Sequence, residues 1–439
     1  MNPPIVASSL ARTPAADVMM SDQIDAIQAN NAFALALYNQ LRAGNATQNL
    51  IESPIAANLA LTMTYAGAVG TTATQMATAL QFGSASNASI FAGQNALSQA
   101  LGGRAASAYA ADLQLAADTG QSAPPESDYQ LEVVNSVWGQ QGYTWLTPFL
   151  NVLAEDYGTG IYVQDFESDP GGADALMNAW VAQETSGNIQ NLIPSSDIND
   201  LTRLVVIDAI HLELPWQTAF EAYATQPASF TTQNGTMMAT VSTPFMNLTN
   251  TYPYVDDGTA QIVWLPLANE QVMVAIALPH DDLPTYEAGL TTSSAVLEPP
   301  TASALVALSL PKISFTSPTF SLAAALQAMG MSEAFVPYGA NFTGMTLGTG
   351  GDGGMNPNLY IGDVVEKADI GMAEDGVQAS AAVAVVVSSA FTTVQSSTPP
   401  PTPVSMVVNR PYFFSVIDAP TGALLFMGHV ADPTQTGGG

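Results

Sequence analysis

Residues 374 to 387 read Glu374-Asp-Gly-Val-Gln-Ala-Ser-Ala-Ala-Val-Ala-Val-Val-Val387, and the interpretation of the whole chain starts from this stretch. At even positions from 378 to 388, most residues are smaller or more polar than their neighbours at odd positions. The odd positions are all apolar, and they are Val377, Ala379, Ala381, Val383, Val385 and Val387. A repeat of two residues with one apolar set is typical of a strand with one buried face.

The segment that follows this strand-like stretch has the composition of an exposed loop. Residues 388 to 403 are rich in Ser, Thr and Pro, which favour turns and loops over regular structure. Two explanations fit a strand pattern that runs directly into a loop. The first is an ordinary strand followed by a linker, and the second is a loop that can itself become a strand.

The chain of 439 residues is acidic because basic residues are scarce. It holds 37 Asp and Glu against 7 Lys and Arg, and its net charge is −30. Such a surface disfavours contact with nucleic acids, heparin-like polyanions and anionic membranes, so we expect none of them as a partner. The chain has no cysteine, which excludes disulfides and thiol chemistry.

Helical patterns dominate the first part of the chain and strand patterns the later part. Apolar spacing predicts helices over residues 21–44 and 54–67, whereas the apolar run over residues 203–214 predicts a long buried strand. Helices followed by strands, without strict alternation, predict an α+β fold. We expect a single domain over residues 21–434, a flexible N-terminal tail over residues 1–20 and a flexible C-terminal tail over residues 435–439.

Catalytic and cofactor motifs are weak in this sequence. A G-x-G-x-x-G pattern begins at Gly348, but turn residues follow it where a nucleotide site needs a helix. No G-x-S-x-G motif is present. Three histidines, His211, His280 and His429, lack the spacing of a metal site. We therefore expect no enzyme activity, no cofactor and no bound metal.

Residues 1 to 20 do not have the basic start and apolar core of a signal peptide. The compartment stays open on this basis, with an extracytoplasmic or secreted location favoured. We expect the protein to be a monomer.

A series of motifs along the chain resembles the serpin family of serine protease inhibitors, in a prokaryotic-type form. The motifs occur in the order of the family, over about residues 24 to 434. They are Asn49-Leu-Ile-Glu-Ser-Pro54, Asn178-Ala-Trp180, Leu204-Val-Val-Ile-Asp208 through Trp216, Leu310-Pro-Lys312, Asn341-Phe-Thr-Gly-Met345, Asp363-Val-Val-Glu-Lys-Ala368, Asn409-Arg-Pro-Tyr412 and Leu425-Phe-Met-Gly-His429.

The resemblance implies about nine helices, three β-sheets and a long exposed reactive loop over about residues 374–406. In this family a protease cleaves the loop and is trapped as an acyl-enzyme while the cut loop inserts into the main sheet. This insertion is a known example of strand addition to a sheet, and it releases strain. The alternating stretch from Val377 to Val387 favours such a suicide-type inhibitor. A non-inhibitory serpin that acts as a chaperone, carrier or storage protein is the alternative.

The resemblance also assigns site residues, in four groups. The hinge, where the loop leaves the sheet, is Glu374, Gly376, Val377, Ala379 and Ala381. The breach, where insertion begins, is Lys312, Glu374 and Trp216. The shutter, where the sheet parts, is Ser53, Asp208 and Glu366, with two acids where the family usually has Asn and His. The reactive bond, counted from the hinge glycine, joins Ala390 and Phe391.

The residue before the reactive bond predicts the target protease. A small residue such as Ala390 suits the shallow pocket of an elastase-like or subtilisin-like protease. A shift of one residue would place Phe391 before the cut and favour a chymotrypsin-like enzyme. No Lys or Arg lies between Ala368 and Asn409, so a trypsin-like pocket would leave its buried carboxylate unpaired.

Overall fold

The computed structural model describes residues 3–45, 47–120, 122, 124–234, 237–316, 320–346, 359–377 and 402–436. Most of its helices precede the long strands along the chain, as the α+β prediction requires. The α-helices are α1 Met20–Leu41, α2 Pro54–Tyr65, α3 Gly70–Ala79, α4 Asn87–Gly102, α5 Arg104–Thr119, α6 Thr147–Tyr157, α7 Pro170–Glu184, α8 Leu283–Ala288 and α9 Ala323–Ala328.

The main sheet has the strand order β1-β4-β3-β5-β15-β14-β11, with β13 paired to β5 and β12 paired to β13. Its long central pair, β3 and β5, is antiparallel. The strands are β1 Ile5–Val6, β3 Gln130–Gln140, β4 Ile161–Gln164, β5 Leu204–Pro215, β11 Ile313–Thr316, β12 Phe320–Ser321, β13 Val364–Glu366, β14 Asp369–Met372 and β15 Gly376–Val377.

The second sheet has the order β16-β10-β7-β8-β9-β17-β18-β2, and β6 pairs with β7. Its strands are β2 Leu50–Glu52, β6 Gln226–Asn234, β7 Met237–Asp256, β8 Ala260–Leu267, β9 Val272–Pro279, β10 Ser303–Pro311, β16 Val404–Val407, β17 Tyr412–Asp418 and β18 Ala423–Val430.

The expected third sheet is not separate in the described part of the chain. Strand β7 is 20 residues long. Its residues 237–245 pair with β6, residues 245–253 pair with β10, and residues 254–256 pair with β8. A single long strand therefore joins the β6 and β10 strands to β8 and the strands beyond it. Of the expected reactive loop over about residues 374–406, residues 378–401 lie outside the described residues.

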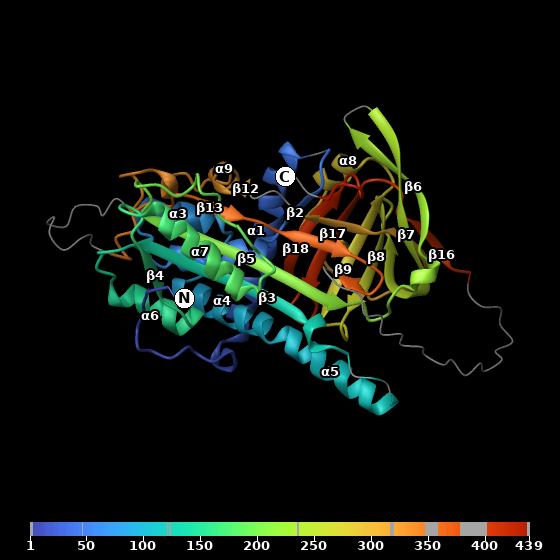
Figure 1. The fold of residues 1–439 in the computed structure, drawn as a ribbon, viewed down its shortest axis with the longest axis horizontal. Coiled ribbons are helices and arrows are strands. Elements are labelled where there is room, and N and C mark those ends of the chain that lie inside the picture. Colours follow the sequence, from blue (N-terminus) through green and yellow to red (C-terminus); the bar gives the residue numbers. More distant parts are fainter. Residues whose placement is uncertain are drawn as a thin grey trace.

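Helix α7 lies across one face of the main sheet, over β3 and β5 (Figure 1). Trp180 of α7 packs edge-on against Trp138 of β3, with ring centroids 5.6 Å apart. The apolar side chains of β5 alternate between this helix and the core on the other face: Ile207 belongs to the α7 cluster and Leu212 to the central core. This alternation explains why the β5 sequence is apolar at nearly every position.

The N-terminal segment that we expected to be a loose tail is bound to the body of the protein. Strand β1 pairs with the edge strand β4, with Ile5 opposite Tyr162. Further along, the guanidinium of Arg12 donates to the Asn95 side chain of α4 at 2.9 Å and also to Ser98. Gly160 fits this arrangement, because an added Cβ would lie 2.4 Å from the Val6 carbonyl oxygen. At the other end Gln435 accepts a hydrogen bond from Asn49.

Every Lys and Arg of the chain contacts a carboxylate or a carbonyl within the protein. The pairs are Arg12 with Asn95, Arg42 with Glu287, Arg104 with Asp418, Arg203 with Glu167, Lys312 with Glu374, Lys367 with the Gln190 carbonyl and Arg410 with the Pro279 carbonyl. The seven cations thus serve intramolecular contacts, and they are far fewer than the 37 acidic side chains of the sequence.

Candidate functional site

Strand β15 occupies a position between β5 and β14 at one end of the main sheet. Gly376 lies opposite Pro215 of β5, Val377 lies opposite Leu214 of β5, and Val377 also pairs with Met372 of β14. The side chain of Val377 is 2% exposed and packs into the central core. The first residues of the alternating stretch are therefore already part of the sheet.

Gly376 is required by the close approach of β5. A Cβ at this position would lie 2.4 Å from the Leu214 carbonyl oxygen and 2.9 Å from the Pro215 Cα. Both contacts are with backbone atoms, which cannot move away as a flexible side chain could. The hinge glycine therefore lets β15 reach hydrogen-bonding distance of β5.

The turn between β14 and β15 is held by Trp216, the residue directly after β5. The Trp216 indole donates to the Ala373 carbonyl at 2.7 Å, and its backbone N–H donates to the Asp375 carbonyl at 2.9 Å. The backbone N–H of Phe220 donates to the Glu374 carbonyl at 2.8 Å. Trp216 is 6% exposed, so this anchor is largely shielded from water.

The carboxylate of Glu374 has two partners at the same turn. The ammonium group of Lys312 donates to Oε2 at 2.5 Å, and the Thr225 hydroxyl donates to Oε1 at 2.8 Å. Burial alone would raise the pKa of Glu374, but the hydrogen bonds from Lys312 and Thr225 outweigh it and lower the pKa below that of a free glutamate. The three expected breach residues thus meet around one turn.

Closer to the middle of the sheet, β13 pairs directly with β5 and no strand lies between them. Val364 lies opposite Val206, and Val365 lies opposite Ile207, in parallel register. Strand β15 at the top and β13 below therefore contact the same strand β5. Any extension of β15 along β5 would have to separate β13 from it.

The Ser53 and Glu366 residues of the expected shutter are in contact beside this pairing. The backbone N–H of Ser53 donates to Oε1 of Glu366, and the Ser53 hydroxyl donates to the Leu425 carbonyl at 2.9 Å. Both residues are buried. The backbone of Asp208 follows Ile207 on β5, but its side chain lies outside the described part. Sequence reasoning missed Glu52, another buried acid, which lies directly before Ser53.

Four expected site residues lie outside the described residues. They are the hinge residues Ala379 and Ala381 and the reactive-bond residues Ala390 and Phe391. Sequence reasoning also missed Thr225 and Phe220, which hold the β14–β15 turn through a hydroxyl and a backbone N–H. Their only sequence signal is their position a few residues after Trp216.

No helix in the described part of the chain is long and apolar enough to cross a bilayer. The same residues contain no group of three or more His, Asp or Glu side chains that could hold a metal ion.

Comparison with known proteins identifies the family. The family model for serpins, described as serine protease inhibitors, matches residues 28–433. The chain belongs to the serpin family. An uncharacterized serpin-like protein of Thermococcus kodakarensis is 30% identical over 93% of this chain and 85% of its own length. The bovine leukocyte elastase inhibitor is 27% identical over 92% of this chain and 98% of its own length.

Solved serpin structures share the fold. The native state of tengpin, a thermophilic serpin, has a TM-score of 0.75 and 24% identity, and the match covers 98% of this chain and 97% of tengpin. Human thyroxine-binding globulin has a TM-score of 0.76 and 22% identity, and the match covers 94% and 100% of the two chains. Serpins as a family inhibit proteases and are not catalysts, although some members do not inhibit.

Proposed function

We propose that this serpin is a suicide-type inhibitor of serine proteases, which traps its target by inserting the cleaved reactive loop into the main sheet. The observation that carries the proposal is the position of β15. The hinge already pairs with β5, Val377 is buried, and Gly376 fits where a side chain would collide with the Leu214 carbonyl.

The residues after Val377 support continued insertion along β5. The apolar set Ala379, Ala381, Val383, Val385 and Val387 is in phase with Val377, and Val377 faces the core. No charged residue and no proline lies between residues 377 and 398, so no side chain opposes entry into the sheet. Burial of these five side chains would contribute roughly 5 kcal/mol or more.

The proposed targets are elastase-like, subtilisin-like or chymotrypsin-like proteases, with cleavage between Ala390 and Phe391. A relative of this chain is named as an inhibitor of leukocyte elastase, which agrees with a small residue before the cut. All basic residues of the chain are held by internal contacts, and the surface is strongly acidic. A protease with a basic surface would therefore associate faster at low salt.

The experiment is incubation with a panel of elastase, subtilisin, chymotrypsin and trypsin, followed by denaturing gels and mass spectrometry. We expect a covalent complex that survives boiling in detergent with one of the first three, and a cut after Ala390 or Phe391. Clean cleavage by all of them without any complex would instead identify a non-inhibitory serpin. A stable trypsin complex would refute the assigned reactive bond.

A further inference from the structure

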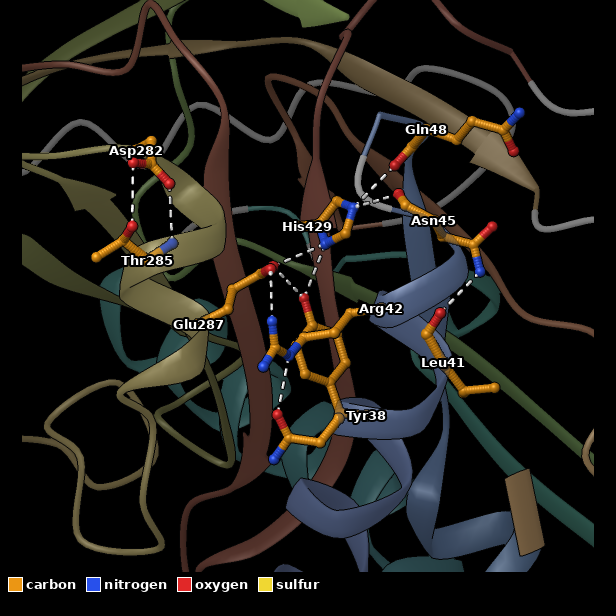
Figure 2. A network of polar contacts seen from close by, with 10 residues as sticks. Tyr38, Leu41, Arg42, Asn45, Gln48, Asp282, Thr285, Glu287 and His429 are labelled. Carbon is orange, nitrogen blue, oxygen red and sulfur yellow. Dashed lines mark hydrogen bonds and ion pairs between the residues drawn. The ribbon is translucent and has the colours of Figure 1, made fainter. Parts of the chain in front are cut away.

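Three polar side chains meet in the interior, at a place that has no part in the proposed inhibition (Figure 2). Tyr38 comes from α1, Glu287 from α8 and His429 from β18, and each is at most 2% exposed. The Tyr38 hydroxyl lies 2.5 Å from Glu287 Oε1 and 2.8 Å from His429 Nδ1. Nδ1 in turn lies 2.8 Å from the same Oε1 atom, so the three atoms form a closed triangle.

The other nitrogen of the His429 ring carries a hydrogen. Nε2 lies 2.8 Å from the Gln48 carbonyl oxygen and 3.2 Å from the Asn45 carbonyl oxygen (Figure 2). Carbonyl oxygens only accept hydrogen bonds, so Nε2 must be the donor. In a neutral ring, Nδ1 would then be an unprotonated acceptor that faces the triangle.

A neutral ring beside an ionised Glu287 does not fit the triangle. Burial and the neighbouring Glu287 carboxylate hold the pKa of Tyr38 well above its usual range, so its hydroxyl keeps one hydrogen. If that were the only hydrogen, it could bridge one of the three contacts and would leave Nδ1 and Oε1 with opposed lone pairs at 2.8 Å. A second hydrogen, on Nδ1, turns this contact into a charge-assisted hydrogen bond.

We propose that His429 is held as an imidazolium, and that Tyr38, Glu287 and His429 form a proton-dependent clasp that joins α1, α8 and the C-terminal strand β18. When the proton leaves, the clasp holds a buried carboxylate without its nearest counter-charge. Isolated buried charges are strongly disfavoured, so the contacts between the three elements weaken.

The other ionisable groups around the clasp do not replace the imidazolium. Arg42, which directly follows α1, lies 4.0 Å from Oε2 of Glu287, and this distance is beyond that of a hydrogen bond. Glu52 of β2 acts electrostatically on Tyr38 and raises its pKa further. Tyr286 of α8 is a neighbouring phenol, and from β17 the uncharged Phe413 packs against the Tyr38 ring.

The sign of the pH effect follows from the number of bound protons. A free imidazole loses its proton near pH 6.5, so above this pH the folded chain binds one proton more than the unfolded chain. The stabilisation is complete below about pH 6.5 and is lost as the pH rises. The equilibrium constant for unfolding should therefore increase about tenfold per pH unit until the folded chain also releases the proton.

The direct test is nitrogen NMR of the histidine rings in the full-length protein at pH 8. Both ring nitrogens of His429 should give the signals of a protonated ring. His280, whose side chain is 42% exposed beside Asp256, gives the internal reference signals. An unprotonated Nδ1 in His429 at pH 8 would overturn the proposal.

A pair of variants provides the second test. His429→Gln keeps a donor toward the Gln48 carbonyl but removes the titrating group, so its stability should lose the tenfold-per-unit slope between pH 6.5 and pH 8. The matched control His280→Gln should keep that slope. If His429→Gln retains the slope of the original protein, the clasp does not bind the proton. If this variant does not fold, the NMR signals of the unmodified protein decide.

Discussion

The ammonium group of Lys312 lies 2.5 Å from the carboxylate of Glu374 and ties the junction of β10 and β11 to the turn between β14 and β15. This turn connects β14 directly to β15, so the ion pair fixes where the hinge enters the sheet. Lys312 is one of two lysines in the chain. The other, Lys367, donates to the Gln190 carbonyl at 3.0 Å.

Replacing the Glu374 carboxylate should loosen the hinge. Glu374→Gln keeps the size of the side chain but removes the charge that Lys312 pairs with, so spontaneous loop insertion and polymerisation on mild heating should accelerate. The loss of global stability should stay under about 1 kcal/mol, because Lys312 is partly exposed. Native gels after timed heating measure the rate. Unchanged rates in Glu374→Gln would mean that the pair does not control insertion.

The same pair predicts an acid-sensitive hinge. The pKa of Glu374 is lowered by its hydrogen bonds to Lys312 and Thr225, so its contribution is present above about pH 4.3 and is lost as the pH falls through the lowered value. The Trp216 and Phe220 amides bond to this turn, so their protection from hydrogen exchange, measured relative to the intrinsic exchange rate at each pH, should fall on acidification. Glu374→Gln is the control, and it should show little of this pH dependence at the two amides.

A side chain at Gly376 should convert the inhibitor into a substrate. In Gly376→Val the new Cβ would collide with the Leu214 carbonyl, so β15 should leave β5 and insertion should start late. We expect the number of inhibitor molecules consumed per trapped protease to rise severalfold. Gly44→Ala is the matched control, because nothing lies within 4 Å of the added Cβ. Equal stoichiometry for both variants would contradict the role of β15.

A charge at Val377 should block insertion after its first residue. Val377 is 2% exposed in the core, and Val377→Arg would require a guanidinium to be buried there without a partner. Cleavage by the target protease should continue, but the covalent complex and the rise in melting temperature after cleavage should both be lost. Val377→Thr, which keeps the shape of the side chain, should retain most of both effects. Normal complex formation by Val377→Arg would argue against insertion at this register.

A buried ion pair away from the hinge should dominate the stability of the α5 region. Arg104 at the start of α5 makes two hydrogen bonds to Asp418, whose side chain is fully buried. Arg104→Met would leave this carboxylate unpaired and should cost about 3–5 kcal/mol. Denaturant unfolding measures the difference. Glu167→Gln, which removes an exposed partner of Arg203, should cost under about 1 kcal/mol; equal losses would refute the contrast.

Local patterns predicted several elements because each rests on contacts between neighbours in sequence. The apolar run over residues 203–214 matches β5, Leu204–Pro215, and the helical spacing after Ser21 matches α1. Helix α1 starts at Met20, one residue before the predicted range of 21–44, and no side chain caps its N-terminus. The meeting of Lys312, Glu374 and Trp216 was expected only from resemblance to the family, since their spacing in sequence carries no such signal.

Features that depend on long-range contacts could not be predicted from local patterns. The N-terminal segment has no regular apolar pattern in sequence, yet Arg12 binds Asn95, which lies 83 positions later. Tyr38 and His429 meet across 391 positions, and the motif that contains His429 gives no sign of this contact. The expected third sheet is not confirmed in the described residues, and the pattern of β7 does not reveal that it pairs with different strands along its length.

The outer edge of the main sheet is formed by β1, a strand of only two residues laid along β4. An edge this short offers an incoming chain very few free backbone groups, which is how many sheet proteins avoid joining edge to edge. In this protein the short edge matters for the proposed loop insertion. If the cleaved loop enters between β5 and β14 as we propose, the short β1 edge keeps a second chain from pairing with the border of the same sheet.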